Sequence, residues 1–459
     1  MSTVQGDMNA IRRADAIVAD RLRLAAAREH LPAPDRAASA AEAAAAVSAG
    51  SAHAARFASE IDAAVTGTAL ALDAAEAHPA EVWAHARAAH ADPTVWFEQA
   101  VVLGHPVHPL ARSRGVLDAS QIRAFAPEHR PRIALGLYRV DGLRAGPDWP
   151  VRDEVGPLLP LHPWQAERHR LGSPAASWDG AAPLTSLRTI ATGRWHVKCA
   201  VDLQLTSAVR HVSPAAVHNG PILSARLAAP AARCGITLLP ETAAAVHGPD
   251  GPRSDLAAIL RPAPHTLAGD RIAPVAALAE PCPATGRPIA AAIAGGELDR
   301  WWAALVDVVC APLRLFAATG AALEAHGQNT LVAFDTAGRP ARLVYRDLGG
   351  VRVPDPGRVL HGAIGCDDEA ERARKLIAAL FPTTLTALVE ALADWTGTDP
   401  GRWWKTVAAA SRDVAAASPA LAAALFAPTW PIKATTAMRL ADDPLTDIWA
   451  RVGNPLADA

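Results

Sequence analysis

Three cationic side chains lie within or beside one short alternating stretch, and a cluster of this kind can do chemistry on an anion. From Trp195 to Leu205 apolar residues alternate with polar ones, which is the period of a β-strand with one buried face. Lys198 belongs to the polar set, while Arg188 precedes the stretch and Arg210 follows it. Like charges held so closely repel each other unless an anion lies between them. The stretch therefore indicates a polyphosphate or polycarboxylate site; the alternative is a solvated strand face with scattered charges.

A second cluster lies in the segment of residues 104–115, which contains two His, two Pro, two Arg and two Gly. Proline fixes φ, so the backbone that carries His105 and His108 should be stiff. A His-x-x-His pair can bind metal, but no third ligand of suitable spacing is nearby. Imidazoles beside Arg112 and Arg114 therefore favour anion recognition. The alternative is a structural loop whose histidines are buried and hydrogen bonded.

A third cluster occurs where a predicted helix ends and a predicted hairpin follows. Apolar residues recur at three- and four-residue steps over 298–324, and the helix is expected to end in a polar run. That run contains Glu324, His326 and Asn329. Two strand patterns follow around a turn at 335–340, and the second strand ends at Asp347. Protein kinases bring a magnesium-binding Asn and Asp together in a comparable way, although their Gly-rich loop is missing from this sequence. The alternative is a set of unrelated capping or surface groups.

The composition limits the classes of protein to which this chain can belong. The 459 residues are 51% hydrophobic and 20% charged, so the chain can bury a large core, and its length suggests about three domains. A net charge of −2 argues against general binding of nucleic acid or of anionic membranes. The five cysteines are scattered without a CxxC pair, which fits a reducing compartment. No signal peptide and no long uninterrupted apolar run are visible, so we expect a cytoplasmic protein that uses neither nucleic acid nor membrane.

The remaining segments must position these clusters. Residues 9–91 are rich in Ala, with charges at helical intervals, which predicts a small helical domain. Residues 133–140 favour a strand, and the Pro-, Gly- and Ala-rich region of 212–296 favours loop-linked strands and short helices. Helical patterns return over 373–392 and 403–416. Since no repeat or low-complexity linker interrupts the chain, we expect its parts to pack around one cleft.

Several motifs, in the same order and over nearly the whole chain, resemble those of the IucA/IucC-like synthetases, which are NRPS-independent siderophore (NIS) synthetases. The motifs are Gly104-His-Pro-Val-His-Pro109, Ser186-Leu-Arg-Thr189, Lys198 to Arg210, His326-Gly-Gln-Asn329, Arg346-Asp347 and Asn454-Pro-Leu456. The resemblance implies an α+β fold with a three-part cupped-hand architecture. We expect a helical thumb at 1–95, mixed α/β fingers with an ATP-phosphate-binding strand at 96–272, and a largely helical palm with a β-hairpin at 273–459.

The resemblance also implies a reaction and its cofactors. Such a synthetase adenylates a carboxylic acid, citrate-like or another dicarboxylate, with ATP and Mg²⁺. It then condenses the activated acid with an amine, hydroxylamine or alcohol in siderophore biosynthesis, releasing AMP and pyrophosphate. Members of the family commonly dimerise, so a homodimer is expected.

The site residues implied by the motifs fall into four groups. The triphosphate would be held by Ser186, Arg188, Thr189 and Lys198. The catalytic set between the carboxylate and the α-phosphate would be Arg210 and His326, with Lys198. The acid or phosphate side would be lined by His105, His108, Arg112 and Arg114. Magnesium or the nucleotide would face Glu324, Asn329 and Asp347. One departure is that Arg112 replaces the usual Lys of the family loop and Gly115 comes one position early, so we expect the acid specificity to differ.

Three alternatives stay open beside this hypothesis. The same adenylating chemistry could act on a non-siderophore acid in another secondary-metabolite pathway, or the chain could be a non-catalytic relative that binds a carboxylate or a siderophore. The third alternative is an iron-siderophore reductase or binding protein, because the C-terminal region of the family is often labelled by resemblance to such a reductase. An iron–sulfur centre needs clustered cysteines, and only Cys366 lies beyond Cys310. Retention of every cation in the motifs argues against a degenerate relative.

Overall fold

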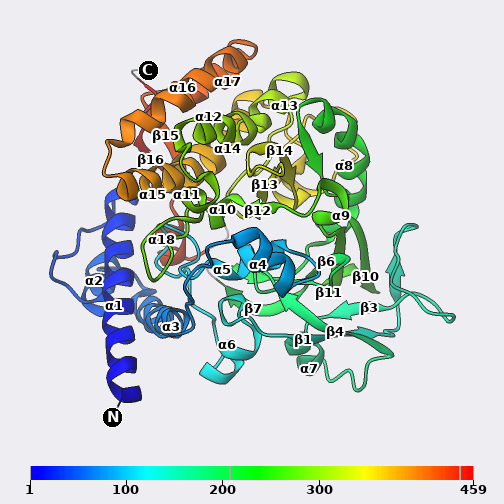
Figure 1. Ribbon diagram of the computed structural model, residues 1–459. Coiled ribbons are helices and arrows are strands. Elements are labelled where there is room, and N and C mark those ends of the chain that lie inside the picture. The colour runs from blue at the N-terminus through cyan, green and yellow to red at the C-terminus, as the bar shows by residue number, and fades with distance from the viewer. Residues whose placement is uncertain (1, 206–207, 444–445, 458–459) are drawn as a thin grey trace.

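The structure is a computed structural model that describes residues 2–205, 208–443 and 446–457 (Figure 1). Helices and strands are mixed along the chain, in agreement with the expected α+β class. Three groups of elements position the candidate residues: an N-terminal group of helices, an eight-stranded antiparallel sheet, and a largely helical C-terminal half that contains a smaller sheet. The proposed boundaries at 95/96 and 272/273 stay a prediction.

Helices form the first part of the chain, as its Ala-rich amphipathic pattern predicts. They are α1 (Ser2–Glu29), α2 (Ala40–Val47), α3 (Ala54–Asp73), α4 (Val82–Ala89), α5 (Thr94–Ala100), α6 (Ala119–Phe125) and the 3₁₀ turn η1 (Pro127–His129). Helices α1, α2 and α3 pack around buried apolar residues such as Leu22 and Phe57. Ser39 caps α2 and is bonded back by Glu42, which satisfies backbone donors at the start of that helix.

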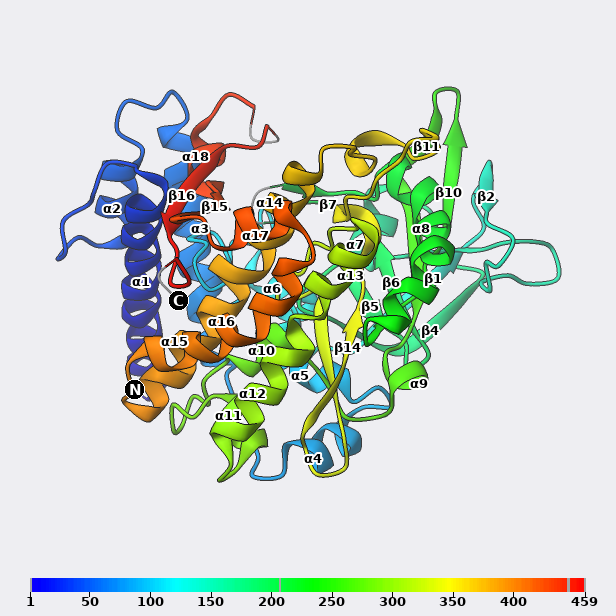
Figure 2. The ribbon, with the colours of Figure 1, turned by 90° about the horizontal axis from the view of Figure 1, so that it is seen from above.

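The first helix also contacts the last segment of the chain. Glu29 accepts hydrogen bonds from the backbone of Thr436 at 2.9 Å and of Ala437 at 2.8 Å, at the start of α18 (Thr435–Leu440). A buried ion pair joins Arg439 to Glu60 of α3. Figure 2 shows the blue N-terminal helices beside the red C-terminal segment. The N-terminal helices are therefore not an isolated domain but pack against residues from the far end of the chain.

The large sheet has the order β2-β10-β11-β6-β5-β4-β1-β3. Its strands are β1 (Ile133–Tyr138), β2 (Leu143–Ala145), β3 (Leu159–Leu161), β4 (Ala176–Pro183), β5 (Thr189–Ala191), β6 (Trp195–Cys199), β10 (Thr242–Gly248) and β11 (Gly251–Pro262). Helix α7 (Pro163–Arg168) contacts β1, and α8 (Pro214–Arg233) contacts β10 and β11. The apolar core between them includes Leu135, Val197 and Leu260.

The alternating stretch is not one half-exposed strand, and the prediction of a single element there is wrong. Strand β6 ends at Cys199, and β7 (Val201–Leu205) turns away to pair with β8 (Ala208–Arg210) in a separate two-stranded sheet. Because β6 lies between β5 and β11 inside the large sheet, its polar side chains are also covered: His196 is 0% exposed and Lys198 8%. Residues 206 and 207 of the stretch lie outside the described residues.

The expected hairpin is present in a four-stranded sheet of order β12-β13-β14-β9. Its strands are β9 (Ile236–Leu238), β12 (Ile272–Pro274), β13 (Thr330–Phe334) and β14 (Pro340–Tyr345). The preceding helix is shorter than predicted and broken in two, α12 (Leu298–Val309) and α13 (Ala311–Thr319). Pro312 has no N–H to continue the first helix, and Gly320 ends the second in the left-handed conformation. Glu324, His326 and Asn329 consequently lie on a loop.

Further helices surround this sheet. They are α9 (His265–Ala268), α10 (Val275–Leu278), α11 (Ile289–Ala294), α14 (Glu369–Ala379), α15 (Thr386–Thr396), α16 (Pro400–Ala416) and α17 (Pro419–Leu425), with the single turns η2 (Leu348–Gly350), η3 (Gly362–Ile364) and η4 (Leu380–Leu385). A hairpin of β15 (Thr429–Lys433) and β16 (Trp449–Gly453) follows. One large apolar core unites them, and it contains the Trp302–Trp403 pair and Trp430.

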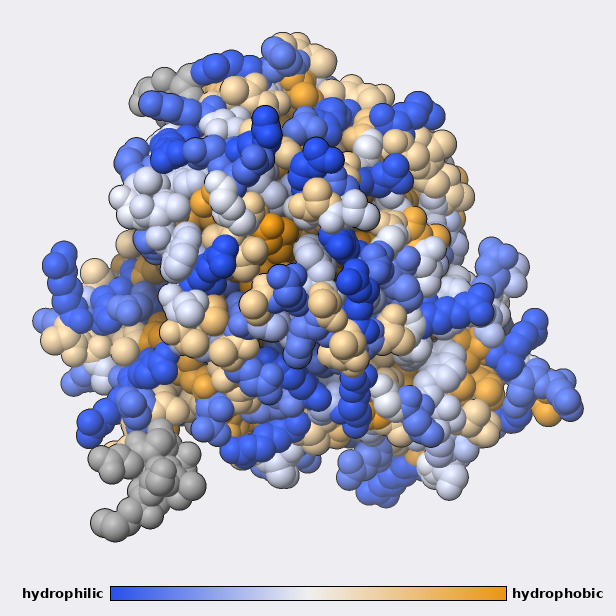
Figure 3. All heavy atoms as spheres, in the orientation of Figure 1, coloured by the Kyte–Doolittle hydropathy of each residue, from blue (hydrophilic) through white to orange (hydrophobic). Residues whose placement is uncertain are grey.

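Two helical stretches, 298–319 and 369–396, are long and apolar enough to cross a membrane by length and composition, but 61% of each apolar window is buried inside the protein. Burial of this kind is typical of core helices. On the face shown in Figure 3, polar side chains surround only small groups of apolar ones.

Replacing Trp302 by Ala should destabilise the fold by about 3 to 5 kcal/mol, because it removes a large side chain from the core. Trp302 is 1% exposed and donates its indole N–H to the carbonyl of Trp403 at 3.2 Å. Urea unfolding followed by tryptophan fluorescence measures the loss. Trp395→Ala is the matched control, since Trp395 is 43% exposed, and an equal loss in both variants would contradict the assignment of this core.

Candidate functional site

Lys198 and Asp347 form the centre of the candidate site. The Lys198 ammonium of β6 donates to both carboxylate oxygens of Asp347, at 2.8 and 2.6 Å. Asp347 directly follows Arg346, just past β14, and has a positive φ of 74°, which turns its side chain towards β6. Burial alone would raise the pKa of Asp347, but Lys198 and then Arg261 hold it well below its ordinary value. The carboxylate is thus ionised, and its side chain is still 24% exposed.

A second buried ion pair supports this centre. Arg261 of β11 donates its Nε to Glu241 at 2.8 Å and places its Nη2 3.4 Å from Asp347. Glu241 also accepts the backbone N–H of Leu348 at 3.3 Å. It packs so closely against α8 that a Cβ on Gly220 would lie 2.9 Å from its Oε2. Neither Glu241 nor Arg261 was singled out from the sequence, because both lie in the region of 212–296, where only loop-linked strands and short helices were expected.

The phosphate-binding candidates of residues 186–189 lie next to Lys198. Thr189 is the direct cross-strand neighbour of Lys198 in the β5–β6 pair. The turn before it is tight: Leu187 has a φ of 65°, and Ser186 accepts the backbone N–H of Thr189 at 3.1 Å. Arg188 donates to the carbonyls of Arg210 at 3.0 Å and His211 at 2.6 Å, so its side chain joins this turn to the end of β8.

A buried network missed by the sequence analysis holds this turn against the hairpin. Glu98 of α5 is 0% exposed and accepts Arg346 Nη2 at 2.5 Å. Glu98 also accepts the hydroxyl of Thr185, at 2.5 Å, and its backbone N–H, at 3.1 Å. Arg346 in turn donates to the carbonyl of Gln328. The chain between β4 and β5 is therefore tied to the open end of the hairpin, where β13 begins and β14 ends. Arg346 was part of a motif, whereas nothing in the sequence pattern singled out Glu98 as a site residue.

Arg210 and His326 lie within the electrostatic field of the same carboxylates. Burial lowers the pKa of Arg210, and Glu324 and Asp347 act in the opposite direction. Burial also lowers the pKa of His326. The charges of Glu324 and Asp347 raise this pKa, whereas those of Arg346 and Arg210 lower it. His326 is therefore a neutral imidazole at pH 7. The structure brings Lys198, Arg210, His326 and Asp347 together although they come from four separate segments.

Oxygen ligands suited to Mg²⁺ lie beside this group. The carboxylate of Glu324 packs against Gly350 so closely that a Cβ there would lie 1.9 Å from its Oε2. It has no hydrogen-bond or ion-pair partner among the described residues. Asn329 is 6% exposed and donates its amide to the Glu324 carbonyl at 3.4 Å, and its Oδ1 has no hydrogen-bond partner among the described residues. Together with Asp347, the side chains of Glu324 and Asn329 offer the hard oxygen donors that Mg²⁺ prefers. In the described part of the chain, no group of three or more His, Cys, Asp or Glu is placed to hold a metal.

His105 and His108 extend this group towards the N-terminal helices. Burial and then the charges of Arg21 and Arg210 lower the pKa of His108 to about 3. Its Nδ1 accepts the N–H of Leu110 at 3.0 Å, so the neutral ring carries its proton on Nε2. The ring of His105 lies 6.0 Å from that of His108 between centroids. Both imidazoles are neutral, which fits a donor role and not a cationic one.

Arg112 and Arg114 are engaged elsewhere, and nothing in their contacts supports a direct role in acid binding. Both pair with Glu128, Arg112 at 3.2 Å and Arg114 at 2.5 Å, and all three side chains are at most 5% exposed. Arg112 also donates to the carbonyls of Val101 and Val102. Burial alone would raise the pKa of Glu128, but the two guanidinium groups lower it to about 2. The pair of arginines therefore fixes the loop that carries the histidines.

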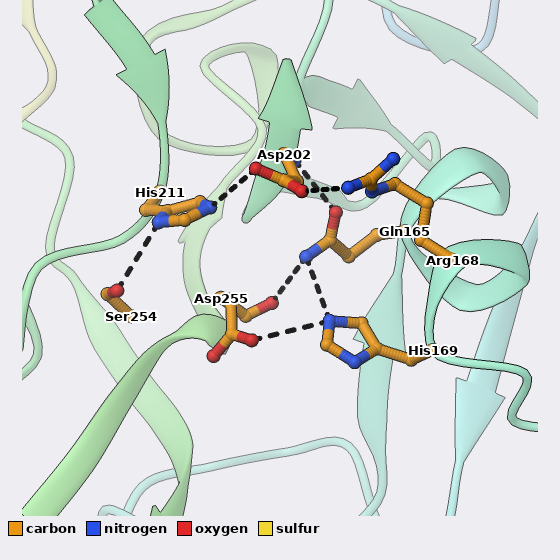
Figure 4. A pocket seen from close by; sticks show the side chains of 7 residues that line it. All are labelled: Gln165, Arg168, His169, Asp202, His211, Ser254 and Asp255. Atoms are coloured by element: carbon orange, nitrogen blue, oxygen red, sulfur yellow. Dashed lines mark hydrogen bonds and ion pairs between the residues drawn. The ribbon is translucent and has the colours of Figure 1, made fainter.

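A hollow of about 200 Å³ lies on the other side of the β7–β8 pair. It is lined by Gln165, Arg168, His169, Asp202, His211, Ser254 and Asp255, whose side chains bond mainly to one another (Figure 4). For example, Arg168 pairs with Asp202 at 2.5 Å. None of the predicted site residues lines this hollow, so we do not place the site there.

Replacing Glu128 by Gln should cost about 3 to 5 kcal/mol of stability at pH 7, because it leaves two buried guanidinium groups without their counter-charge. Since the pKa of Glu128 is lowered on folding, its contribution is complete above about pH 4.3, the pKa of a free Glu, and is lost as the pH falls towards about 2. Urea unfolding of both proteins at several pH values tests this, with Glu76→Gln as an exposed control. A gap that persists at pH 2 would contradict the account.

Two family models match the chain. Residues 93–145 and 152–280 match the IucA / IucC family, and residues 299–445 match a model described as ferric iron reductase FhuF-like transporter. The first match covers the segments of the histidine loop, the 186–189 turn and Lys198. The second covers the loop and hairpin of Glu324 and Asp347.

Curated relatives and solved structures agree with this result. Staphyloferrin A synthase of Staphylococcus aureus is 29% identical over 29% of this chain and 30% of its own length. The rhizobactin siderophore biosynthesis protein RhbC of Rhizobium meliloti is 26% identical over 55% of this chain and 53% of its own length. The chain thus spans about half, or less, of the length of the curated relatives that it matches.

The fold is shared with the ATP-bound aerobactin synthetase IucA from Klebsiella pneumoniae, at a TM-score of 0.73, 21% identity, and coverage of 88% of this chain and 83% of that one. This likeness confirms the expected fold class. The family match, the siderophore-synthesis relatives and the shared fold together confirm the resemblance that the motifs indicated: the chain is similar to the IucA / IucC family over residues 93–145 and 152–280 and has the fold of the aerobactin synthetase IucA.

Proposed function

We propose that this protein is an ATP-dependent ligase of siderophore biosynthesis that adenylates a citrate-like acid or another dicarboxylate. The activated acid is then condensed with an amine, hydroxylamine or alcohol, and AMP and pyrophosphate are released. One observation carries the proposal: Lys198, Arg210 and His326, from three separate segments, each interact electrostatically with Asp347 from a fourth, and Lys198 does so by direct hydrogen bonds. The matches to siderophore synthetases support the same reaction class.

The phosphate side of the reaction is assigned to the large sheet. Ser186, Arg188, Thr189 and Lys198 would hold the triphosphate, and the tight turn at Leu187 presents backbone groups as well as side chains. Mg²⁺ would be held by Glu324, Asn329 and Asp347 and would supply charge neutralisation at the phosphate oxygens. In the structure Lys198 is paired with Asp347, so the ammonium is already desolvated and oriented before nucleotide binds.

The acid side is assigned to Arg210 and His326. When a carboxylate oxygen attacks the α-phosphorus, negative charge accumulates on the phosphoryl oxygens, and donors that are already oriented stabilise that charge best. Arg210 carries a positive charge, and neutral His326 can donate a hydrogen bond without repelling Mg²⁺. No described residue is an evident general base for the second step, which proximity to the acyl group would promote.

The alternatives receive less support from these observations. A non-catalytic binding relative would not need the oxygen donors of Glu324 and Asp347 beside the cations. A reductase with an iron–sulfur centre would need clustered cysteines, whereas Cys310 is buried and Cys366 lies far along the chain. The same ligase chemistry on a non-siderophore acid differs only in substrate. We further propose that the protein acts in the cytoplasm, as a homodimer, on small molecules alone.

Replacing Lys198 or Arg210 by Ala should lower acid-dependent pyrophosphate release about 10- to 150-fold. A charge-assisted hydrogen bond contributes about 1.5–3 kcal/mol, and about 1.4 kcal/mol is a factor of ten. Lys433→Ala is the matched control, because Lys433 pairs with Asp447 on the C-terminal hairpin. Circular dichroism and urea unfolding verify that each variant folds. Full activity in either site variant would show that the site is wrongly assigned.

The acid itself can be identified by trapping the acyl group with hydroxylamine. The purified protein, ATP and MgCl₂ are incubated with citrate, 2-oxoglutarate, succinate and a citryl monoamide in separate reactions. We expect a hydroxamate, with stoichiometric AMP, from at least one of these acids. If none reacts while ATP still binds, the binding-protein alternative takes the place of the ligase.

A further inference from the structure

We infer that Arg21 of helix α1, together with His108, forms a subsite for a second carboxylate of the acid substrate. The inference rests on the proposed function, and it adds to it a residue from the N-terminal helices, to which no site residue was assigned by motif. It predicts that the substrate carries at least two carboxylates, one at Arg210 and one at this subsite.

Arg21 is a buried cation without a complete set of partners. It is 7% exposed, and one guanidinium nitrogen, Nη2, donates to the carbonyl of Leu103 at 3.0 Å. The other, Nη1, is buried without a hydrogen-bond partner among the described residues. No carboxylate lies within ion-pair distance of Arg21 in that part of the chain. Burial and then Arg112 lower the pKa of Arg21 to about 10, so it remains charged at neutral pH.

The nearest counter-charge is already in use. Glu280 acts on Arg21 electrostatically, but its Oε1 accepts the backbone N–H groups of Val102 and Leu103, at 2.8 and 3.2 Å. Other buried arginines of this region have carboxylates in direct contact: Arg112 and Arg114 share Glu128, and Arg439 pairs with Glu60. A buried charge that lacks such a partner is costly, which indicates that an external anion completes the site.

His108 supplies a second unpaired donor at the same place. Its Nδ1 accepts the Leu110 N–H, so its Nε2 carries the proton, yet Nε2 is buried without a partner. Of all charged groups, Arg21 acts most strongly on this ring, and Arg210 is next. His108 belongs to the loop that follows Leu103, whose carbonyl Arg21 contacts. A charged donor and a neutral donor together suit a carboxylate, which accepts hydrogen bonds at both oxygens.

The experiment compares acids that differ by one charge. Succinate, with two carboxylates, is compared with succinamate, its monoamide with one, in the hydroxamate assay on the whole chain. The variants are Arg21→Gln and Arg21→Lys, with His108→Gln as an independent test of the same subsite. Arg23→Gln is the matched control, because Arg23 is on the same helix but is partly exposed and paired with Asp20 at 2.6 Å. Urea unfolding accompanies every variant.

Arg21→Gln should raise KM for the diacid about 10- to 150-fold, with KM for ATP and KM for the monoamide unchanged. His108→Gln should act in the same direction, and Arg21→Lys should retain part of the preference. An equal rise for both members of a pair, or no rise at all, would overturn the subsite and leave Arg21 a structural residue.

Calorimetric titration with citrate in the absence of ATP separates this inference from the ligase proposal. If no acid is turned over but citrate binds the wild type and not Arg21→Gln, the subsite stands and the ligase proposal fails. If acids are turned over with unchanged selectivity in Arg21→Gln, the ligase proposal stands and the subsite fails.

Discussion

The ion pair between Lys198 and Asp347 is the contact on which the site depends, because it joins two sheets. Lys198 belongs to β6 of the eight-stranded sheet, and Asp347 follows β14 of the four-stranded sheet. Two buried charges are expensive to remove from water, and their attraction offsets that cost only if the geometry is well held. Arg261 and Glu241 supply that support from β11 and from the start of β10. The relative position of the phosphate-binding and metal-binding groups thus follows from one polar contact and its neighbours.

Much of the site could be predicted from the sequence, since motifs and hairpin signals are local. The β13–β14 hairpin is confirmed, with Leu331 opposite Val344. The predicted members Lys198, Arg210, His326 and Asp347 come together as their motifs implied. What failed was the path of the backbone: alternation continues through Ala200, but β6 ends there because β7 finds a different partner. Periodicity reports which residues are apolar and not which strand they pair with.

The residues missed by sequence reasoning are partners in long-range ion pairs. Glu98 and Arg346 are 248 residues apart, and although Glu128 is only 16 residues from Arg112, no local pattern joins these two either. A sequence shows an arginine but not the carboxylate that will lie beside it in the fold. Arg112 and Arg114 were expected to line the acid site, and in the structure both pair with Glu128. The same residue type is structural or substrate-binding according to whether the protein supplies a counter-charge.

The contact between α1 and the C-terminal segment has a consequence for how the protein is made. Helix α1 carries Arg21, and its last residue, Glu29, is bonded to the backbone at 436 and 437. A ribosome-bound chain that has emerged as far as α17 already holds both residues of the Lys198–Asp347 pair, whereas α1, which packs on α2 and α3, still lacks its contacts with α18 and β16. The nucleotide half of the site can therefore take shape during synthesis before the N-terminal helices gain their contacts with α18.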